Sequence, residues 1–269
     1  MDNNKKANQQ EANQPTIQKG FVKFNKQIEG QYDRNFLAKS QEFYDCILEH
    51  MRSALYGRKT IGLDIGAGPG IGARLAATIP LETQITGYEP SKTHYEGARF
   101  AEKLAKKNHC THYQTIQGGI EAIPMSSHNS LDYILILRAG HEIAESLGSP
   151  DKFIAKCTEL LPLLKNNGHL IIADPQFSRH ITENPDRFSS LIEEVKRFQT
   201  ASIGHSHDPH DYICFWDLEQ RLYSTGLHLE RQDIIPKDDV LQYVLSKGFR
   251  MKESPTLFYV QTYKKKEKK

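Results

Sequence analysis

The sequence predicts an α/β fold in which a mostly parallel sheet is covered by helices on both faces. Short apolar runs alternate with helical patterns through residues 21–200, which is typical of parallel strands joined by crossover helices. A glycine-rich turn, Gly66–Gly70, follows the first apolar run, and an acidic residue, Glu89, ends the second. The last two strand patterns are joined by one helix-containing segment, which indicates an antiparallel hairpin at the sheet edge.

The strands are predicted from apolar runs bounded by turn residues. Two of them, Leu131–Leu137 and His169–Ala173, are almost continuously apolar, as expected for strands buried on both sides. The predicted strands are Thr60–Ile65, Gln84–Glu89, Tyr113–Gln117, Leu131–Leu137, His169–Ala173, Leu227–Ile235 and Leu257–Tyr263.

The helices are predicted from apolar residues spaced three or four positions, or a multiple, apart. Ser91 is a predicted N-cap, and Asn166–Gly168 is predicted to end the helix before the fifth strand, because Asn and Gly tolerate left-handed backbone. The predicted helices are Asp33–Leu55, Arg74–Ile79, Ser91–Lys107, Arg187–Thr200 and Leu218–Thr225.

The two ends of the chain are polar and the body is mildly acidic. Residues 1–20 lack large apolar side chains, so we predict a disordered leader without the apolar stretch of a signal peptide. Residues 1–20 have a net charge of +1, and residues 261–269, with five lysines and one glutamate, have +4. Since the whole chain has +2, residues 21–260 are left with −3, which disfavours a nucleic-acid groove. No run of about 18 apolar residues predicts a membrane span. The four cysteines lack a CxxC pair, so we expect reduced thiols and a cytoplasmic protein.

The turn Gly66-Ala67-Gly68-Pro69-Gly70 carries the strongest functional signal. Glycines permit a sharp turn and close approach of a ligand, and we expect free N–H groups of the loop to bind a carboxylate. Asp64 lies two residues before the turn, where it can bind a ligand ammonium group. Glu89 lies 19 residues after Gly70, at the place where an acid accepts hydrogen bonds from both ribose hydroxyls.

These motifs, DIGAGPG and GYEPS, resemble the cofactor motifs of class I S-adenosylmethionine-dependent methyltransferases. The resemblance implies a Rossmann-like sheet of seven strands whose last strand is antiparallel. It implies that Asp64 and the loop residues Gly66, Ala67, Gly68 and Gly70 hold the methionine part of the cofactor. It also implies that Glu89, followed by Pro90, holds the ribose, and that Tyr32 belongs to a lid over the cofactor.

The resemblance implies an adenine contact in the segment Gly118–Pro124. The family has an Asp where this sequence has Gly119, so Glu121 or the backbone of Ile120 is the alternative partner of the adenine amino group. The loop after the fourth strand, which begins at Leu137-Arg138, resembles the family's loop between cofactor and substrate. We therefore include Arg138 among the cofactor-binding residues.

Two other interpretations of the glycine turn are a dinucleotide site and a structural turn without a ligand. The dinucleotide fingerprint G-x-G-x-x-G needs a third glycine where this sequence has Ile71. The combination of strand, glycine turn, helix, strand and terminal acid favours a ligand over a purely structural turn.

The candidate catalytic residues follow the fourth and fifth strands, beside the predicted cofactor crevice. His141 has a near-neutral intrinsic pKa and can act as a base, and Asp174 can line the acceptor pocket. For both residues, a structural role in capping the neighbouring backbone is the alternative. His205, His207 and His210 offer three metal ligands in one short segment, but no second cluster completes a shell, so we predict a polar lid loop without metal.

The sequence as a whole predicts a methyltransferase domain over residues 21–263, with lid elements at 21–55 and 175–215 and a basic tail at 264–269. A small-molecule acceptor is the first hypothesis because the body is acidic. The alternatives are an RNA or ribosome-associated methyltransferase, and a methyltransferase-like protein that binds the cofactor without turnover. The sequence does not predict an oligomeric state.

Overall fold

The computed structural model describes residues 41–55, 59–78, 82–92, 94–96, 98, 102, 111–126, 128–203, 206 and 215–266. The predictions for the leader, for Tyr32 and for the histidine cluster His205, His207 and His210 lie outside these residues.

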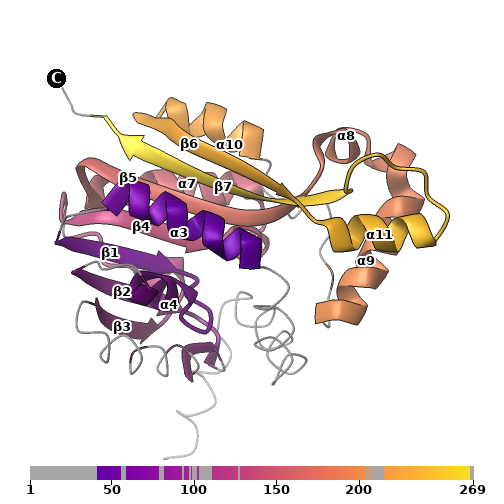
Figure 1. Cartoon of the computed structure of the whole chain (residues 1–269). Helices are drawn as coiled ribbons and strands as arrows, with labels where there is room; N and C mark the ends of the chain where they lie inside the picture. Colours follow the sequence, from indigo (N-terminus) through magenta and orange to yellow (C-terminus); the bar gives the residue numbers. More distant parts are fainter. Residues whose placement is uncertain are drawn as a thin grey trace, which may run out of the picture.

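The centre of the molecule is a seven-stranded sheet in the order β3-β2-β1-β4-β5-β7-β6 (Figure 1). Neighbouring strands from β3 through β5 are parallel, whereas β7 is antiparallel to both β5 and β6. The predicted fold class, including the antiparallel last strand, is confirmed. The strands are β1 (Thr60–Ile65), β2 (Thr83–Glu89), β3 (Thr111–Gln117), β4 (Leu131–Leu137), β5 (Leu164–Phe177), β6 (Leu227–Pro236) and β7 (Thr256–Lys265).

Strand β5 is much longer than predicted, and this changes the interpretation of Asn166–Gly168. Helix α7 (Pro150–Leu160) ends at Leu160 and is followed by a 3-10 turn, Leu161–Leu163. The Asn166–Gly168 triplet lies within β5, where the register with β4 shifts between Leu131 and Tyr133. Asn167 adopts the expected left-handed backbone, with φ 63°. The triplet therefore forms an irregularity in a strand, and the prediction that it ends the helix is wrong.

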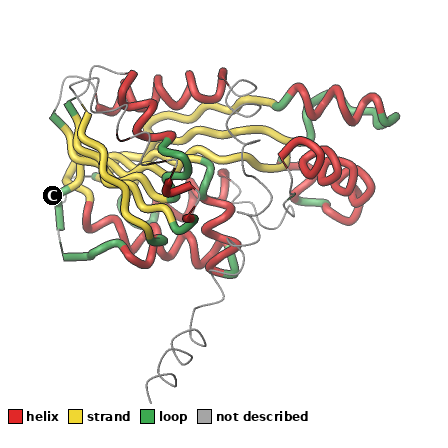
Figure 2. Tube along the Cα trace, turned by 90° about the horizontal axis from the view of Figure 1, so that it is seen from below, coloured by secondary structure: helices red, strands yellow, loops and turns green. Residues whose placement is uncertain are grey.

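Helices cover both faces of the sheet (Figure 2). Helices α3 (Gln41–Leu55) and α4 (Ile71–Thr78) pack on one face, in a core that includes Ile47, Leu135 and Val260. On the other face the core includes residues of α6 (Gly140–Leu147), α7 and α10 (Phe215–Tyr223). Each fully buried Leu or Ile contributes about 1.5–3 kcal/mol, so the two apolar layers fix the positions of the strand ends that form the site.

A third helical group lies beyond the ends of β5, β6 and β7 (Figures 1 and 2). We call α8 (Arg179–Thr182), α9 (Ser189–Ile203) and α11 (Asp238–Ser246) the outer helical unit. Its apolar centre includes Ile192, Val195 and Val244. Helices α8 and α9 come from the segment predicted as a lid, whereas α3, also assigned to a lid, packs on the sheet.

No helix among the described residues is long and apolar enough to cross a membrane. Cys46 and Cys157 are free thiols, and Cys110 and Cys214 lie outside the described part of the chain.

Candidate active site

A cleft opens at the carboxyl ends of β1 and β2, beside the loops that follow β3 and β4. From β1 the chain adds β2 and β3 on one side of the sheet and then β4 and β5 on the other, so this is the switch point of the topology. Ligands of open α/β sheets bind at such a point. Six of the predicted cofactor residues line it: Gly66, Glu89, Pro90, Gly119, Ile120 and Glu121. The structure adds lining residues that the sequence analysis did not assign to the cofactor, Ala139, Glu142 and Ile143 among them.

The N–H groups of the glycine loop are paired within the chain. Gly66 and Ala67 both donate to the Tyr88 carbonyl, at 2.9 and 3.0 Å, and Gly70 donates to the Ala67 carbonyl at 2.9 Å. Gly68 donates to Oε2 of Glu89 at 2.7 Å. The expectation that the loop presents free N–H groups to a carboxylate is therefore wrong, because β2 and the loop itself supply the acceptors.

Two of the loop glycines serve different purposes. A Cβ on Gly66 would lie 2.3 Å from the Cβ of Ala139, so this glycine lets the loop pack against the segment after β4. A Cβ on Gly68 would have no neighbour closer than the Gly66 carbonyl oxygen at 4.0 Å. Both have positive φ, which glycine adopts without strain. The space beside Gly68 is thus open to a ligand.

Glu89 joins the end of β2 to the glycine loop. Its Oε2 accepts the Gly68 N–H and its Oε1 accepts the Ser91 N–H, each at 2.7 Å. Ser91 also accepts the His94 N–H at 3.3 Å, as the predicted N-cap should. Burial raises the pKa of Glu89 to about 8, although the two backbone hydrogen bonds act in the opposite direction.

Asp64 faces helix α4 and does not line the cleft. Its carboxylate accepts a backbone hydrogen bond from Gly72 and lies 3.4 Å from the Tyr113 hydroxyl. A Cβ on Gly72 would lie 2.4 Å from Oδ2 of Asp64, so only glycine fits there. Burial raises the pKa of Asp64 to about 7. In this arrangement Asp64 attaches the first turn of α4 to β1.

Glu121 occupies the space of the side chain that Gly119 lacks. A Cβ on Gly119 would lie 2.5 Å from Oε2 and 2.6 Å from Oε1 of Glu121. Glu121 belongs to a 3-10 turn, Ile120–Ala122, that follows β3. Gly119 is the N-cap of this turn, and its carbonyl accepts the Ala122 N–H. A carboxylate is thus present at the position of the missing acid, supplied from two residues further along the chain.

The Arg138 side chain points away from the cleft, toward α3 and β7. Its backbone has φ 60°, and its N–H donates to the Ala173 carbonyl at 2.6 Å. Its guanidinium lies 3.4 Å from the Tyr44 hydroxyl of α3 and 5.5 Å from the centre of the Phe258 ring. Arg138 does not line the cleft.

His141 and Asp174 form one buried unit. The two oxygens of Asp174 bind Nδ1 and the backbone N–H of His141, each at 2.7 Å. The carboxylate therefore both caps the first turn of α6 and fixes the imidazole. Burial acts to lower the pKa of His141, but the charge and hydrogen bond of Asp174 raise it above its ordinary value. The structure thus shows a capping contact, which the sequence analysis gave as the alternative to a catalytic role, and the same carboxylate also orients the imidazole.

Comparisons with known proteins identify the family. A model of the methyltransferase domain family matches residues 58–234. The chain belongs to this methyltransferase family. Similar solved structures include an S-adenosylmethionine-dependent methyltransferase from Methanosarcina mazei, 14% identical over 81% of this chain and 98% of that chain, with a TM-score of 0.55. The cyclopropane synthase MmaA2 from Mycobacterium tuberculosis is 14% identical over 87% of this chain and 88% of its own, also with a TM-score of 0.55. No curated protein sequence matches the chain.

The enzyme class and the cofactor expected from the sequence, a methyltransferase that uses S-adenosylmethionine, are confirmed by this membership. The cleft fits the cofactor's chemistry. The cofactor has a sulfonium cation, a ribose diol and an adenine amino group, and three glutamates, Glu89, Glu121 and Glu142, line the cleft beside the open space at Gly68. At 14% identity the structural likeness shows the fold, and it does not identify the methyl acceptor.

We predict that the stability of the free protein falls with rising pH because of Glu89. Its folded pKa of about 8 lies above its ordinary value of 4.5, so between these values the folded chain keeps a proton that the unfolded chain has released. The stability that this proton contributes is complete below about pH 4.5 and is lost as the pH rises through about 8. Urea denaturation across this range should show a smaller fall for Glu89→Gln than for the wild type.

The exposed Glu253 provides the matched control, and Glu253→Gln should keep the wild-type dependence. Equal pH dependence in the wild type and Glu89→Gln would show that Glu89 is not the titrating group.

Proposed function

We propose that this methyltransferase transfers the methyl group of S-adenosylmethionine to a small-molecule acceptor that enters the acidic cleft. The observation that supports this most directly is the gathering of Glu89, Glu121 and Glu142 in one cleft. Such a cleft favours a cationic cofactor, because a positive charge stabilises the ionised carboxylates, and it disfavours a polyanion, because a negative charge opposes their ionisation. The acidic body predicted from the sequence acts in the same direction.

The RNA alternative depends on the basic C-terminal segment, and the structure gives part of that segment another role. Lys264 and Lys265 belong to β7. The Lys265 ammonium donates to the carbonyls of Leu161 and Leu164, at 3.0 and 2.5 Å, so this charge is engaged at the end of the α7 segment. Lys266 lies over the Tyr223 ring, 4.6 Å from its centre. These contacts leave fewer cations for nonspecific affinity to nucleic acid than the sequence alone indicates.

Within this proposal each part of the cleft binds one part of the cofactor. The Glu89 carboxylate binds the ribose hydroxyls, and its existing backbone bonds hold it in place for them. The Glu121 carboxylate accepts the adenine amino group, in place of an acid at Gly119. The open space beside Gly68 takes the methionine part, and Tyr32, outside the described residues, stays a predicted lid residue.

The bound cofactor supplies an activated methyl group, so the chain's own residues have to position the acceptor and remove its proton where it has one. We assign proton removal to Nε2 of His141, the ring nitrogen that Asp174 does not contact. His141 is buried and does not itself line the cleft, but Ala139 and Glu142 on either side of it in the chain do. Asp174 is a positioning residue, since it holds Nδ1 of His141 and anchors α6 at the same time. The outer helical unit, at the far ends of β5 and β7, belongs in this proposal to the acceptor side of the site.

Replacing Glu121 is predicted to change how the enzyme recognises adenine. Loss of a hydrogen bond to a charged group costs about 1.5–3 kcal/mol, roughly a 10- to 100-fold weaker affinity. Glu121→Ala should weaken calorimetric binding of S-adenosylhomocysteine by that factor, and it should abolish discrimination against the analogue in which inosine replaces adenosine.

The double variant Gly119→Asp/Glu121→Ala should recover affinity, because the new carboxylate fills the space that Glu121 vacates. Glu253→Ala, at an exposed position, is the neutral control. If Glu121→Ala retains full discrimination between the two nucleosides, the assignment of the adenine contact is wrong.

The pair His141–Asp174 is predicted to set the acidic limb of the pH–rate profile. Removing a general base costs about 10²–10⁴-fold in rate, so His141→Gln should lower kcat by at least about 10² while the cofactor still binds. Asp174→Asn removes the charge that raises the pKa of His141, so the limb should move to lower pH. A purely structural role for the pair would lower activity without moving the limb.

The class of acceptor can be tested by incubating tritiated methyl donor and enzyme with cell extract separated into metabolite, protein and RNA fractions. We expect label in the metabolite fraction, and none with Glu89→Ala at a cofactor concentration that saturates the wild type. Label in RNA alone would replace the small-molecule proposal with the RNA alternative. Label in no fraction would favour the non-catalytic alternative.

A further inference from the structure

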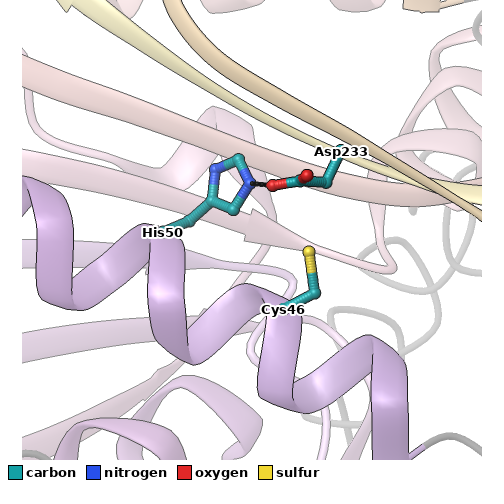
Figure 3. Close-up of side chains that lie close together, drawn as sticks. All are labelled: Cys46, His50 and Asp233. Atoms are coloured by element: carbon teal, nitrogen blue, oxygen red, sulfur yellow. Dashed lines mark hydrogen bonds and ion pairs between the residues drawn. The ribbon is translucent and has the colours of Figure 1, made fainter.

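A second cluster of reactive side chains lies away from the cofactor cleft, between α3 and the edge strand β6. Cys46 and His50 are four residues apart on α3, so both side chains are on the same side of the helix. They face Asp233 of β6, as Figure 3 shows. One ligand atom from each of the three residues lies within 4.8 Å of the other two. Since residue 233 is distant in the sequence, only the folded sheet completes this cluster.

The imidazole of His50 is held in one orientation. Its Nδ1 lies 2.7 Å from Oγ1 of Thr262 on β7, and its Nε2 lies 2.9 Å from Oδ2 of Asp233. His50 is fully buried, so packing also restricts the ring. Histidines that bind metals characteristically use one ring nitrogen for the ion and hydrogen-bond the other to the protein. Thr262 provides this second contact, and Nε2 is directed toward the other two side chains.

The donor set of the cluster is one thiol sulfur, one imidazole nitrogen and one carboxylate oxygen. Sulfur and imidazole nitrogen together suit zinc, which is usually bound tetrahedrally, and three protein ligands leave the fourth position for water or another group. Cys46 is partly exposed, and 40% of the Asp233 side chain is exposed, so an ion can reach the cluster from solvent.

We propose that Cys46, His50 and Asp233 form a binding site for one zinc-type divalent ion, which attaches α3 to β6. The ion binds the Cys46 sulfur as its thiol proton leaves to solvent. Nε2 of His50 gives up the proton that it donates to Asp233 and binds the ion, and the neutral imidazole then carries its one proton on Nδ1, as donor to Oγ1 of Thr262. Asp233 supplies an oxygen. The site is separate from the methyl-transfer cleft and uses none of the residues assigned to it.

Besides His50, Arg231 makes an ion pair with Asp233, and its guanidinium therefore competes with the metal. Its Nε donates to Oδ2 of Asp233 at 2.8 Å. The Arg231 side chain is 38% exposed, so the guanidinium can move into solvent when an ion binds. Removal of the Arg231 charge should therefore strengthen metal binding, whereas removal of a ligand side chain should weaken it.

Cobalt(II) is the probe for the test, because a cobalt–thiolate bond produces a near-ultraviolet charge-transfer band that binding through nitrogen or oxygen does not. Titration of the full chain should give this band at one ion per chain. Cys46→Ser should abolish the band, His50→Gln should weaken binding at least about 10-fold, and Arg231→Gln should tighten it. Zinc should displace the cobalt and raise Tm of the wild type but not of Cys46→Ser, because an ion that binds only the folded state stabilises it.

The matched controls are Cys110→Ser, Cys214→Ser and His112→Gln, which should leave the band unchanged. The band requires sulfur, so cobalt bound only by His205, His207 and His210 would not produce it. A band that persists in Cys46→Ser, or absence of the band from wild-type protein at millimolar cobalt, would overturn the proposal. The gain expected for Arg231→Gln keeps the test valid if a ligand variant folds poorly, and none of these results depends on methyl transfer.

Discussion

The cleft depends on the Glu89 carboxylate, which holds two loops together at the end of β2. One oxygen takes the N–H of Gly68 and the other the N–H of Ser91, so the glycine loop and the start of the following segment are fixed relative to one another. The glycine loop in turn packs against Ala139 only because Gly66 has no side chain. A buried carboxylate without such hydrogen bonds would be costly, and here the bonds also define the wall of the site.

The buried carboxylates of the cleft, together with Asp64 outside it, store unfavourable electrostatic energy that a cationic cofactor can relieve. Burial raises the pKa of Asp64, Glu89 and Glu142, to about 7, 8 and 7. Part of the shift in Glu89 comes from the charges of the other two. In the proposed complex, a sulfonium ion in the cleft would stabilise the ionised forms of Glu89 and Glu142, so cofactor binding and carboxylate ionisation would support each other. The clustering that destabilises the free fold is therefore suited to binding.

Local signals predicted the fold well, because they are properties of short segments. The bounds of β1 and β4 were predicted to the residue, since both strands are apolar runs between polar turns. The errors have a common physical origin, because each concerns backbone groups whose pairing with a neighbouring strand is not a property of the short segment itself. Asn166–Gly168 do permit left-handed backbone, but whether that ends a helix or interrupts a strand depends on pairing with β4. The glycine loop's N–H groups are not free, because β2 supplies their acceptors. The position of the Glu121 carboxylate beside Gly119 and the approach of Asp233 to Cys46 and His50 both depend on the folded backbone, so the sequence did not predict them. The spacing of Cys46 and His50 on one helix was the one detectable sign of the second arrangement.

The insertion of β7 between β5 and β6 has a consequence for how the chain is made. Among the described strands, β6 pairs with β7 alone, and β7 is the last described element. During synthesis β5 and β6 therefore emerge with unpaired edges, and these edges stay unpaired until β7 is available. Such edges are templates for wrong pairing. The order of the strands thus places the greatest risk of misassembly at the stage when β7 emerges, because this one segment must enter between two strands that are already present.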